Sequence, residues 1–245
     1  MRLARLPIRA VAGRQTLLDD PPIYTIAGFL PERACERIVE ASRPLLKPSA
    51  VAQMSEAELG AARIRSGGGR TSSSTFLHHR SVPSLLERAE QLLGMPRTHF
   101  EYPQISRYAT GQQYTSHHDG FDLSTPAGLR LAGDGGQRLC TLLLYLSGCE
   151  SGGETRFTRL GLSVRPQAGT ALIFNPAFMC GTIDPMVQHS AEPAGGEKWV
   201  AQLWVRQNAL HPASRVYESE EHARTATVLQ SAPADAAGGS LDTLL

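Results

Sequence analysis

Two histidines and an aspartate are the residues of this chain best suited to hold a metal ion. His117 and Asp119 are separated by one residue, and His189 lies far downstream. In an extended segment alternate side chains point the same way, so His117 and Asp119 can reach one ion while His118 turns away. Two histidines and one carboxylate on one face of an ion suit iron(II) and leave the opposite positions open. The pattern predicts an iron site at His117, Asp119 and His189.

A lysine follows the predicted ligands on the last expected strand. Alternation along residues 198–206 places five side chains on one face, namely Lys198, Val200, Gln202, Trp204 and Arg206. A lysine directed into the interior is costly unless it meets an anion, and a ligand with a carboxylate would provide one. The alternative is that Lys198 lies in water at the mouth of the strand, next to Glu197. The strand pattern leaves both placements open.

The composition is that of a globular protein with balanced charge. The chain has 245 residues, 41% of them hydrophobic, which is enough for one large domain or two small ones. Its 24 basic and 23 acidic residues give a formal net charge of +1, so no overall field would attract nucleic acid or an anionic membrane. We therefore expect neither nucleic acid nor membrane as a partner, and the oligomeric state stays open.

The cysteines and the first residues bear on the cellular compartment. Four cysteines are widely separated, without the CxxC spacing of zinc sites or redox pairs, and are expected to be reduced thiols. Residues 1–14 carry four arginines but lack the apolar core of a secretion signal, and no later run approaches membrane-spanning length. We expect a cytoplasmic protein. An arginine-rich start that is poor in acidic residues is also typical of an organellar transit peptide.

Residues 21–212 show two helical patterns followed by a series of short strands. After a strand at residues 23–26, helices are expected from about Pro31 to Pro44 and from Ser81, as N-cap, to Gly94. Later strands are expected at Gln104–Tyr108, Leu139–Leu146, Thr155–Phe157, Leu162–Val164, Ala171–Phe174 and Trp199–Val205. This order suggests a mainly β member of the α+β class, a sandwich or barrel with helices on one side.

Three segments are expected to lie outside that regular framework. Residues 1–20 are predicted to be a flexible N-terminal segment, and residues 213–245 are too poor in large apolar side chains to build a core, which predicts a disordered tail. Residues 60–75 are rich in glycine, serine and arginine and are expected to form a mobile loop. The functional alternative for that loop is a lid over a substrate.

Further motifs accompany the metal residues in a definite order. They are Tyr108-x-x-Gly111-x-x-Tyr114 before His117, Gly135-Gly136-Gln137-Arg138 before the strand from Thr141, Gly152-Gly153-Glu154-Thr155, and Lys198-Trp199-Val200 with Trp204 after His189. In this order they closely resemble the prolyl 4-hydroxylase family of iron(II)- and 2-oxoglutarate-dependent dioxygenases. The resemblance runs from about Pro22 to Arg206 and includes Arg70-Thr71-Ser72.

This resemblance implies a double-stranded β-helix, or jelly-roll, for the domain at residues 21–212. It implies that His117, Asp119 and His189 bind iron(II) as the catalytic centre, with 2-oxoglutarate as cosubstrate, dioxygen as co-reactant and ascorbate as a further cofactor that the family admits. Lys198 would hold the distal carboxylate of 2-oxoglutarate. Tyr108 and Thr155 would add hydrogen bonds to it, and Trp204 would line the same pocket.

The implied activity is hydroxylation coupled to decarboxylation of 2-oxoglutarate to succinate and carbon dioxide. We expect the substrate to be a peptidyl or protein side chain, with proline as first choice. Residues 121–134 and 176–188 carry no substrate signature, so hydroxylation of a free amino acid or specialised metabolite stays an alternative. A non-catalytic module that binds a Pro-rich peptide is another. A zinc hydrolase fits less well, because no nearby residue stands out as a general base.

Overall fold

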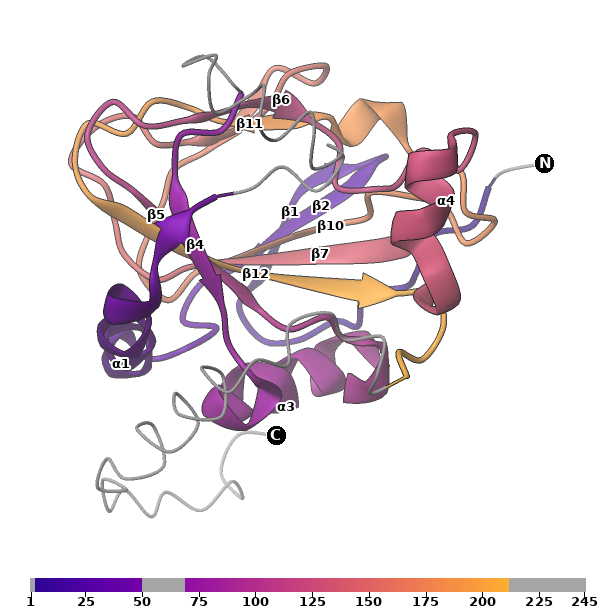
Figure 1. Ribbon diagram of the computed structural model, residues 1–245, viewed down its shortest axis with the longest axis horizontal. Helices are drawn as coiled ribbons and strands as arrows, with labels where there is room; N and C mark the ends of the chain where they lie inside the picture. The colour runs from indigo at the N-terminus through magenta and orange to yellow at the C-terminus, as the bar shows by residue number, and fades with distance from the viewer. Residues whose placement is uncertain (1–2, 50–68, 212–245) are drawn as a thin grey trace.

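Two antiparallel sheets form the framework of the protein (Figure 1). The computed structural model describes residues 3–49 and 69–211. The larger sheet has the order β1-β2-β10-β7-β12-β5-β4-β3 and the smaller one β6-β11-β8-β9. The strands are β1 (Arg14–Asp19), β2 (Pro22–Ile26), β3 (Lys47–Pro48), β4 (Ser73–Phe76), β5 (Gln104–Tyr108), β6 (Tyr114–His117), β7 (Arg138–Tyr145), β8 (Thr155–Phe157), β9 (Leu162–Val164), β10 (Ala171–Phe174), β11 (His189–Ala191) and β12 (Lys198–Arg206).

Three α-helices accompany the sheets in the described part of the chain. They are α1 (Glu32–Ser42), α3 (Pro83–Leu93) and α4 (Pro126–Ala132), and short 3-10 turns lie at Arg43–Leu45, His79–Ser81, Arg97–His99, Gly133–Gly135 and Pro185–Val187. Helix α3 begins after Val82, not after the expected cap Ser81, because Ser81 belongs to the preceding 3-10 turn. It ends as expected at Gly94, whose φ of 63° is in the left-handed region that glycine tolerates.

The larger sheet separates two apolar clusters, one on each face. Helices α1 and α3 pack on one face, where alternate β12 residues such as Trp199 and Leu203 are buried against them. The smaller sheet covers the other face, and Leu143, Tyr145 and Val200 pack there. Figure 1 shows α1 and α3 on one side of the large sheet and β6 and β11 on the other. The alternation along β7 and β12 thus decides which side chains face the space between the sheets.

The N-terminal segment differs from the expectation of a flexible stretch at residues 1–20. Residues 14–19 form β1, which pairs with β2 at the edge of the larger sheet. Leu6 is buried, and Arg5 Nε donates to Asp184 Oδ2 at 3.1 Å. The apolar part of β1 is only Leu17-Leu18, too short a run to be recognised as a strand until β2 pairs with it. The domain therefore includes this segment.

Two other expectations fall mostly on residues outside the described ranges. Residues 60–68 of the Gly- and Ser-rich loop and residues 213–245 of the tail are not described. The described end of the loop runs into β4, whose strand begins at Ser73. Among the described residues, no helix combines the length and the apolar character that crossing a membrane would require.

Candidate metal centre and its pocket

The three predicted metal ligands meet at one end of the smaller sheet. His117 is the last residue of β6 and His189 the first of β11, and the two are direct partners in the antiparallel register. Asp119 follows β6 by two residues. Its Oδ1 lies 3.6 Å from His117 Nε2, and its Oδ2 lies 3.8 Å from His189 Nε2. The three ligand atoms lie within 4.8 Å of one another. His118 is not part of this group, as strand alternation predicts.

The hydrogen bonds of both histidine rings aim a lone pair at the carboxylate. His117 Nδ1 lies 2.9 Å from the Thr115 carbonyl oxygen, and His189 Nδ1 lies 3.0 Å from that of Val187. A carbonyl only accepts, so each Nδ1 carries the proton and each Nε2 is left as an acceptor. Both Nε2 atoms are buried and have no hydrogen-bond partner among the described residues. Buried acceptors without a partner, next to a carboxylate, cost free energy unless a cation binds them. The two Nε2 atoms and the carboxylate therefore fit a metal ion as its ligands.

The protonation states also fit a metal site. Burial lowers the pKa of His189 to about 4, and His117 contributes in the same direction, so the ring is neutral at pH 7. Burial alone would raise the pKa of the Asp119 carboxyl. At acid pH the positively charged His189 ring, the contact with His117 and the Arg138 guanidinium outweigh that effect and lower the pKa, so the carboxylate is ionised at pH 7. Neutral imidazoles and an ionised carboxylate are the forms that bind metal ions.

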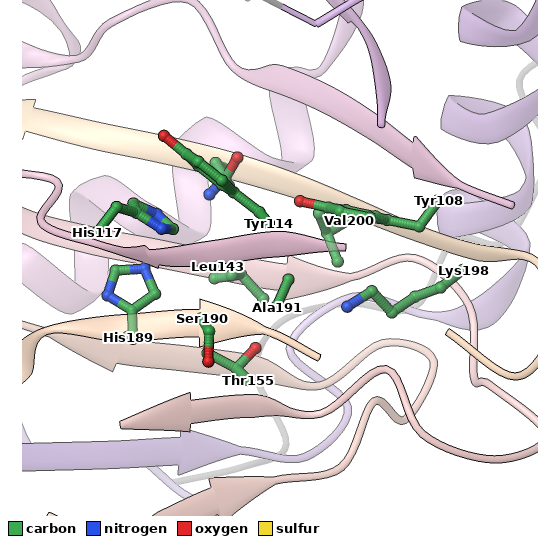
Figure 2. A pocket seen from close by; sticks show the side chains of 11 residues that line it. Tyr108, Tyr114, His117, Leu143, Thr155, His189, Ser190, Ala191, Lys198 and Val200 are labelled. Atoms are coloured by element: carbon green, nitrogen blue, oxygen red, sulfur yellow. The ribbon is translucent and has the colours of Figure 1, made fainter. Parts of the chain in front are cut away.

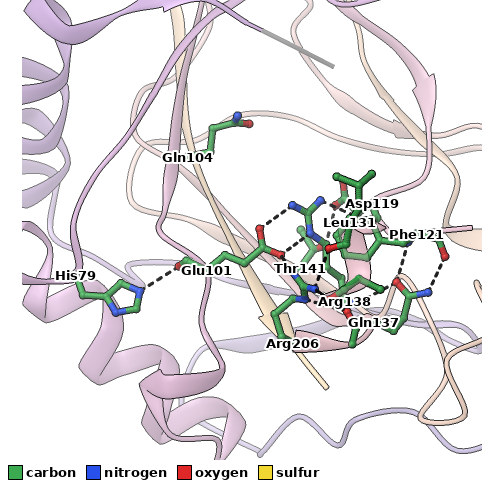
Figure 3. Close-up of polar contacts among 12 residues, drawn as sticks. His79, Glu101, Gln104, Asp119, Phe121, Leu131, Gln137, Arg138, Thr141 and Arg206 are labelled. Carbon is green, nitrogen blue, oxygen red and sulfur yellow. Dashed lines mark hydrogen bonds and ion pairs between the residues drawn. The ribbon is translucent and has the colours of Figure 1, made fainter. Parts of the chain in front are cut away.

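A network of buried polar groups holds Asp119 from behind (Figure 3). Thr141 Oγ1 on β7 donates to Asp119 Oδ2 at 2.8 Å, and Arg138 Nη1 donates to the Asp119 carbonyl oxygen at 3.3 Å. Glu101 accepts from Arg138 Nη2 at 2.7 Å and from Arg206 Nη1 at 3.0 Å. Burial acts against the Glu101 carboxylate, but the two guanidinium groups lower its pKa. The network thus holds the backbone and the carboxylate of Asp119.

Aromatic rings flank both histidines. Tyr114 stacks on His117 with ring centroids 3.6 Å apart and planes 17° from parallel, and Phe174 meets His189 edge-on with ring centroids 4.9 Å apart.

Arg70 supports the Tyr114 ring in turn, because its guanidinium lies 4.9 Å from the Tyr114 ring centroid. Arg70 is itself held by hydrogen bonds to Ser72, Gln104 and Ser106. These contacts restrict the orientation of the rings before any metal binds.

A pocket between the sheets leads from the two histidines to Lys198 (Figure 2). Its lining residues are Tyr108, Tyr114, His117, Leu143, Thr155, His189, Ser190, Ala191, Lys198, Val200 and Gln202. In Figure 2 the two histidines lie at one end of the pocket and Lys198 at the other. The pocket therefore joins a potential metal site to a cation.

Lys198 lies in the interior and not in water at the strand mouth, because its exposed fraction is only 1%. Its Nζ donates to the Gly153 carbonyl oxygen at 2.6 Å and lies 4.6 Å from the centroid of the Tyr108 ring. Burial lowers the pKa of this ammonium to about 8, so it is charged at pH 7. A buried ammonium with few polar partners is stabilised by an anion, and a terminal carboxylate fits that need.

Thr155 is oriented toward the same end of the pocket by Tyr145. The Tyr145 hydroxyl donates to Thr155 Oγ1 at 2.8 Å, which leaves the threonine proton free to donate to a carboxylate. Tyr108 is the register partner of Lys198 on β5, so its ring stands beside the ammonium. Lys198, Tyr108 and Thr155 are therefore brought together as the sequence predicts.

Trp204 does not join them. Lys198 and Trp204 share a face of β12, but six residues along a strand span about 20 Å, so the two side chains cannot line one small pocket. Trp204 is absent from the pocket lining. The Arg138 guanidinium instead stacks on its ring, 3.7 Å from the ring centroid. Gln202 is the β12 residue that lines the pocket beyond Val200, and its Oε1 is buried without a partner among the described residues.

Three residues of the site were not singled out from the sequence. Thr141 and Tyr145 lie on the pocket face of β7 together with Leu143, a placement that the two-residue period of the strand could have indicated. Tyr114 was noted as part of a motif, but its stacking on His117 needed the structure. A polar residue in an otherwise apolar buried strand is the signal that points to such roles.

Comparison with known proteins relates this site to one group of enzymes. Residues 103–206 match the model of the 2OG-Fe(II) oxygenase superfamily. Probable prolyl 4-hydroxylase 9 of Arabidopsis thaliana is 35% identical over 213 residues, which cover 78% of this chain and 71% of that relative. Many other residues outside the site therefore also agree, in addition to the short motifs.

Solved structures share the fold. The viral collagen prolyl hydroxylase of Paramecium Bursaria Chlorella virus-1, in its complex with 2-oxoglutarate, matches with a TM-score of 0.57 and 26% identity, covering 75% of this chain and 95% of that one. A Trichoplax adhaerens prolyl hydroxylase in complex with a hypoxia inducible factor peptide has a TM-score of 0.52 and 17% identity, covering 82% and 89%, and supports the fold alone. The predicted mainly β jelly-roll class is confirmed.

Proposed function

The chain belongs to the prolyl 4-hydroxylase-like 2OG-Fe(II) oxygenases and is a 2-oxoglutarate-dependent dioxygenase, and from this membership we propose that it hydroxylates proline in a peptide or protein. The family uses iron(II), 2-oxoglutarate and dioxygen, and the His-Asp-His group is the observation that carries the proposal. Use of ascorbate and a cytoplasmic location stay predictions.

In this proposal each part of the pocket has a separate task. His117, Asp119 and His189 hold iron(II) through the two orphaned Nε2 atoms and the carboxylate. Lys198 and the Thr155 hydroxyl hold the distal carboxylate of 2-oxoglutarate, beside the Tyr108 ring. When bound, iron(II), 2-oxoglutarate and dioxygen supply the chemistry that adds one oxygen atom to the substrate and releases succinate and carbon dioxide.

Two features support a proline side chain in a peptide as the substrate. The relative named above is a probable prolyl 4-hydroxylase, and one structural neighbour is a collagen prolyl hydroxylase.

The test is mass spectrometry of proline-rich peptides after incubation with the protein, iron(II) and 2-oxoglutarate. The expected product is the peptide with one added oxygen atom on proline, formed together with an equal amount of succinate. The same peptides with alanine in place of proline are the matched substrates and should stay unmodified. His117→Ala removes a proposed iron ligand and should abolish the product.

Two control measurements separate this proposal from the alternatives. A panel of free amino acids, free proline included, tests small-molecule hydroxylation, and oxygen addition only to a free amino acid would refute the peptide substrate. Joint binding of iron(II) and 2-oxoglutarate tests catalysis against a simple peptide-binding module. A protein that binds the peptide but does not bind iron(II) and 2-oxoglutarate together would refute the hypothesis of an active hydroxylase.

A further inference from the structure

Thr141 contacts one of the two oxygens of the Asp119 carboxylate. Its Oγ1 donates to Asp119 Oδ2 at 2.8 Å. Each oxygen lies near one histidine, Oδ1 3.6 Å from His117 Nε2 and Oδ2 3.8 Å from His189 Nε2, but Oδ1 accepts no hydrogen bond from the described residues. The two oxygens of this carboxylate are therefore not equivalent, although nothing in the chemistry of an isolated aspartate distinguishes them.

The position of Thr141 makes this hydrogen bond hard to replace. Thr141 is fully buried on β7, between its register partners Phe174 on β10 and Trp204 on β12. Its neighbours on the same strand, Leu142 and Leu143, offer no side-chain acceptor, so the carboxylate is the polar group that satisfies the hydroxyl. A β-branched side chain in a strand is restricted at χ1, which directs the hydroxyl along one line.

The backbone of the Asp119 segment is held separately from its carboxylate. Arg138 Nη1 donates to the Asp119 carbonyl oxygen, and Gln137 Oε1 accepts from the Phe121 N–H at 2.7 Å while its Nε2 donates to the Phe121 carbonyl oxygen at 2.8 Å. With the backbone held, rotation of the carboxylate about its own side-chain bonds is the freedom that remains. The Thr141 hydrogen bond restricts that rotation.

We propose that Thr141 is a positioning residue that makes Asp119 a one-oxygen ligand through Oδ1. An octahedral ion held by two histidines and one carboxylate oxygen keeps three open positions. 2-Oxoglutarate would need two of these positions, which would leave one for dioxygen. Coordination by both oxygens of Asp119 would occupy one of the three. The inference rests on the proposed iron site, and it concerns how that site stays open.

The test compares Thr141→Val, which keeps the shape but lacks the donor, with Thr141→Ser, which keeps the donor. Anaerobic titration with Co(II), without 2-oxoglutarate or peptide, measures metal affinity alone. We expect Thr141→Val to bind about 10- to 100-fold more weakly, the range found for groups that orient a metal ligand, and Thr141→Ser to stay within about threefold of the natural chain. At saturating Co(II), 2-oxoglutarate should also bind more weakly to the valine variant, because the released Oδ2 competes for a position.

Thr170→Val is the matched control, since Thr170 is also a buried threonine but makes no side-chain hydrogen bond among the described residues. It should leave both affinities unchanged. Thermal unfolding of the metal-free variants checks the fold, and Thr141→Ala takes the place of valine if that variant does not fold. Unchanged Co(II) and 2-oxoglutarate affinities in a folded variant without the hydroxyl would overturn the inference. Failure of the natural chain to hydroxylate a proline peptide would refute only the substrate, because no peptide is used here.

Discussion

His117 and His189 are direct partners across β6 and β11, and their rings lie 4.4 Å apart between centroids. This pairing brings two residues from distant parts of the chain to one end of the smaller sheet. Each Nδ1 is hydrogen-bonded to the backbone carbonyl oxygen of the residue two positions earlier in the chain. The backbone therefore orients both rings and points both Nε2 atoms toward Asp119. The metal centre is thus set by strand register more than by side-chain packing.

Asp119→Asn should remove metal binding while His118→Ala should not. The amide keeps the size of the side chain but loses the negative charge, and we expect Co(II) affinity to fall by more than about 100-fold, beyond the usual effect of outer groups. His118 lies between the two ligands in sequence but outside the cluster, so its replacement should change affinity by less than about threefold. Isothermal titration measures both. A large loss in the His118 variant would contradict the strand register described above.

The affinity for 2-oxoglutarate should fall as pH rises through about 8. Burial lowers the pKa of Lys198 from its ordinary 10.5 to about 8, so the ammonium is present below that pH and lost above it. The dicarboxylate keeps its charge over this range, so the change comes from the lysine, and each unit above about 8 should weaken binding up to about tenfold. Titrations of 2-oxoglutarate into the Mn(II)-loaded protein between about pH 7 and 9 measure this change in affinity.

Lys198→Met is the control for this pH effect. Its binding of 2-oxoglutarate should be weak and should not change with pH, since the titrating group is gone.

The buried lysine also affects the pH dependence of folding stability, in the direction opposite to that of a lysine in a salt bridge. Since the pKa is lower in the folded protein, the charged lysine reduces stability below pH 8, and this loss is relieved as pH rises from about 8 to 10.5. A pH profile of the natural chain that matches that of the methionine variant would contradict the assignment.

Gly153→Ala should weaken 2-oxoglutarate binding more than an equivalent change elsewhere. Gly153 has a φ of 69°, and a Cβ added there would lie 3.1 Å from Cys149 Sγ and 3.2 Å from Lys198 Cδ. We expect a loss of stability of about 1–2 kcal/mol from the left-handed backbone. The contact with Lys198 should add about a tenfold loss of 2-oxoglutarate affinity, the size of one weakened hydrogen bond to a charged group.

Gly161→Ala is matched to it, because Gly161 has a φ of 64° and open space where the Cβ would be. It should show the same backbone cost in thermal unfolding with no change in 2-oxoglutarate affinity. Equal affinities in the two variants would show that Gly153 does not position Lys198.

Leu6→Ala should destabilise the protein although Leu6 belongs neither to the metal centre nor to the pocket lining. Leu6 is 6% exposed and packs in the cluster on the helix side of the larger sheet, so truncation should cost about 2–4 kcal/mol. Leu3→Ala is the control, since Leu3 is 43% exposed. Urea unfolding compares the two. Equal midpoints would support the flexible N-terminal segment that the sequence alone suggested.

The sequence by itself determined the features that depend on local periodicity. Alternation placed His117 and Asp119 together and turned His118 away, and the same period put Lys198 and Gln202 on one face of β12. The proline and glycine signals bounded α1 and α3 within a few residues. These features follow from the geometry of one strand or one helix, which a short stretch of chain already contains.

The tertiary structure decided everything that depends on which strands become neighbours. Only the pairing of β6 with β11 brings His189 to Asp119, and only the packing of the smaller sheet on the larger one buries Lys198 instead of leaving it in water. The hydrogen bond from Thr141, the distance that separates Trp204 from the pocket, and the pairing of β1 with β2 have the same origin. Contacts between distant segments are set by register and sheet packing, which no local pattern encodes.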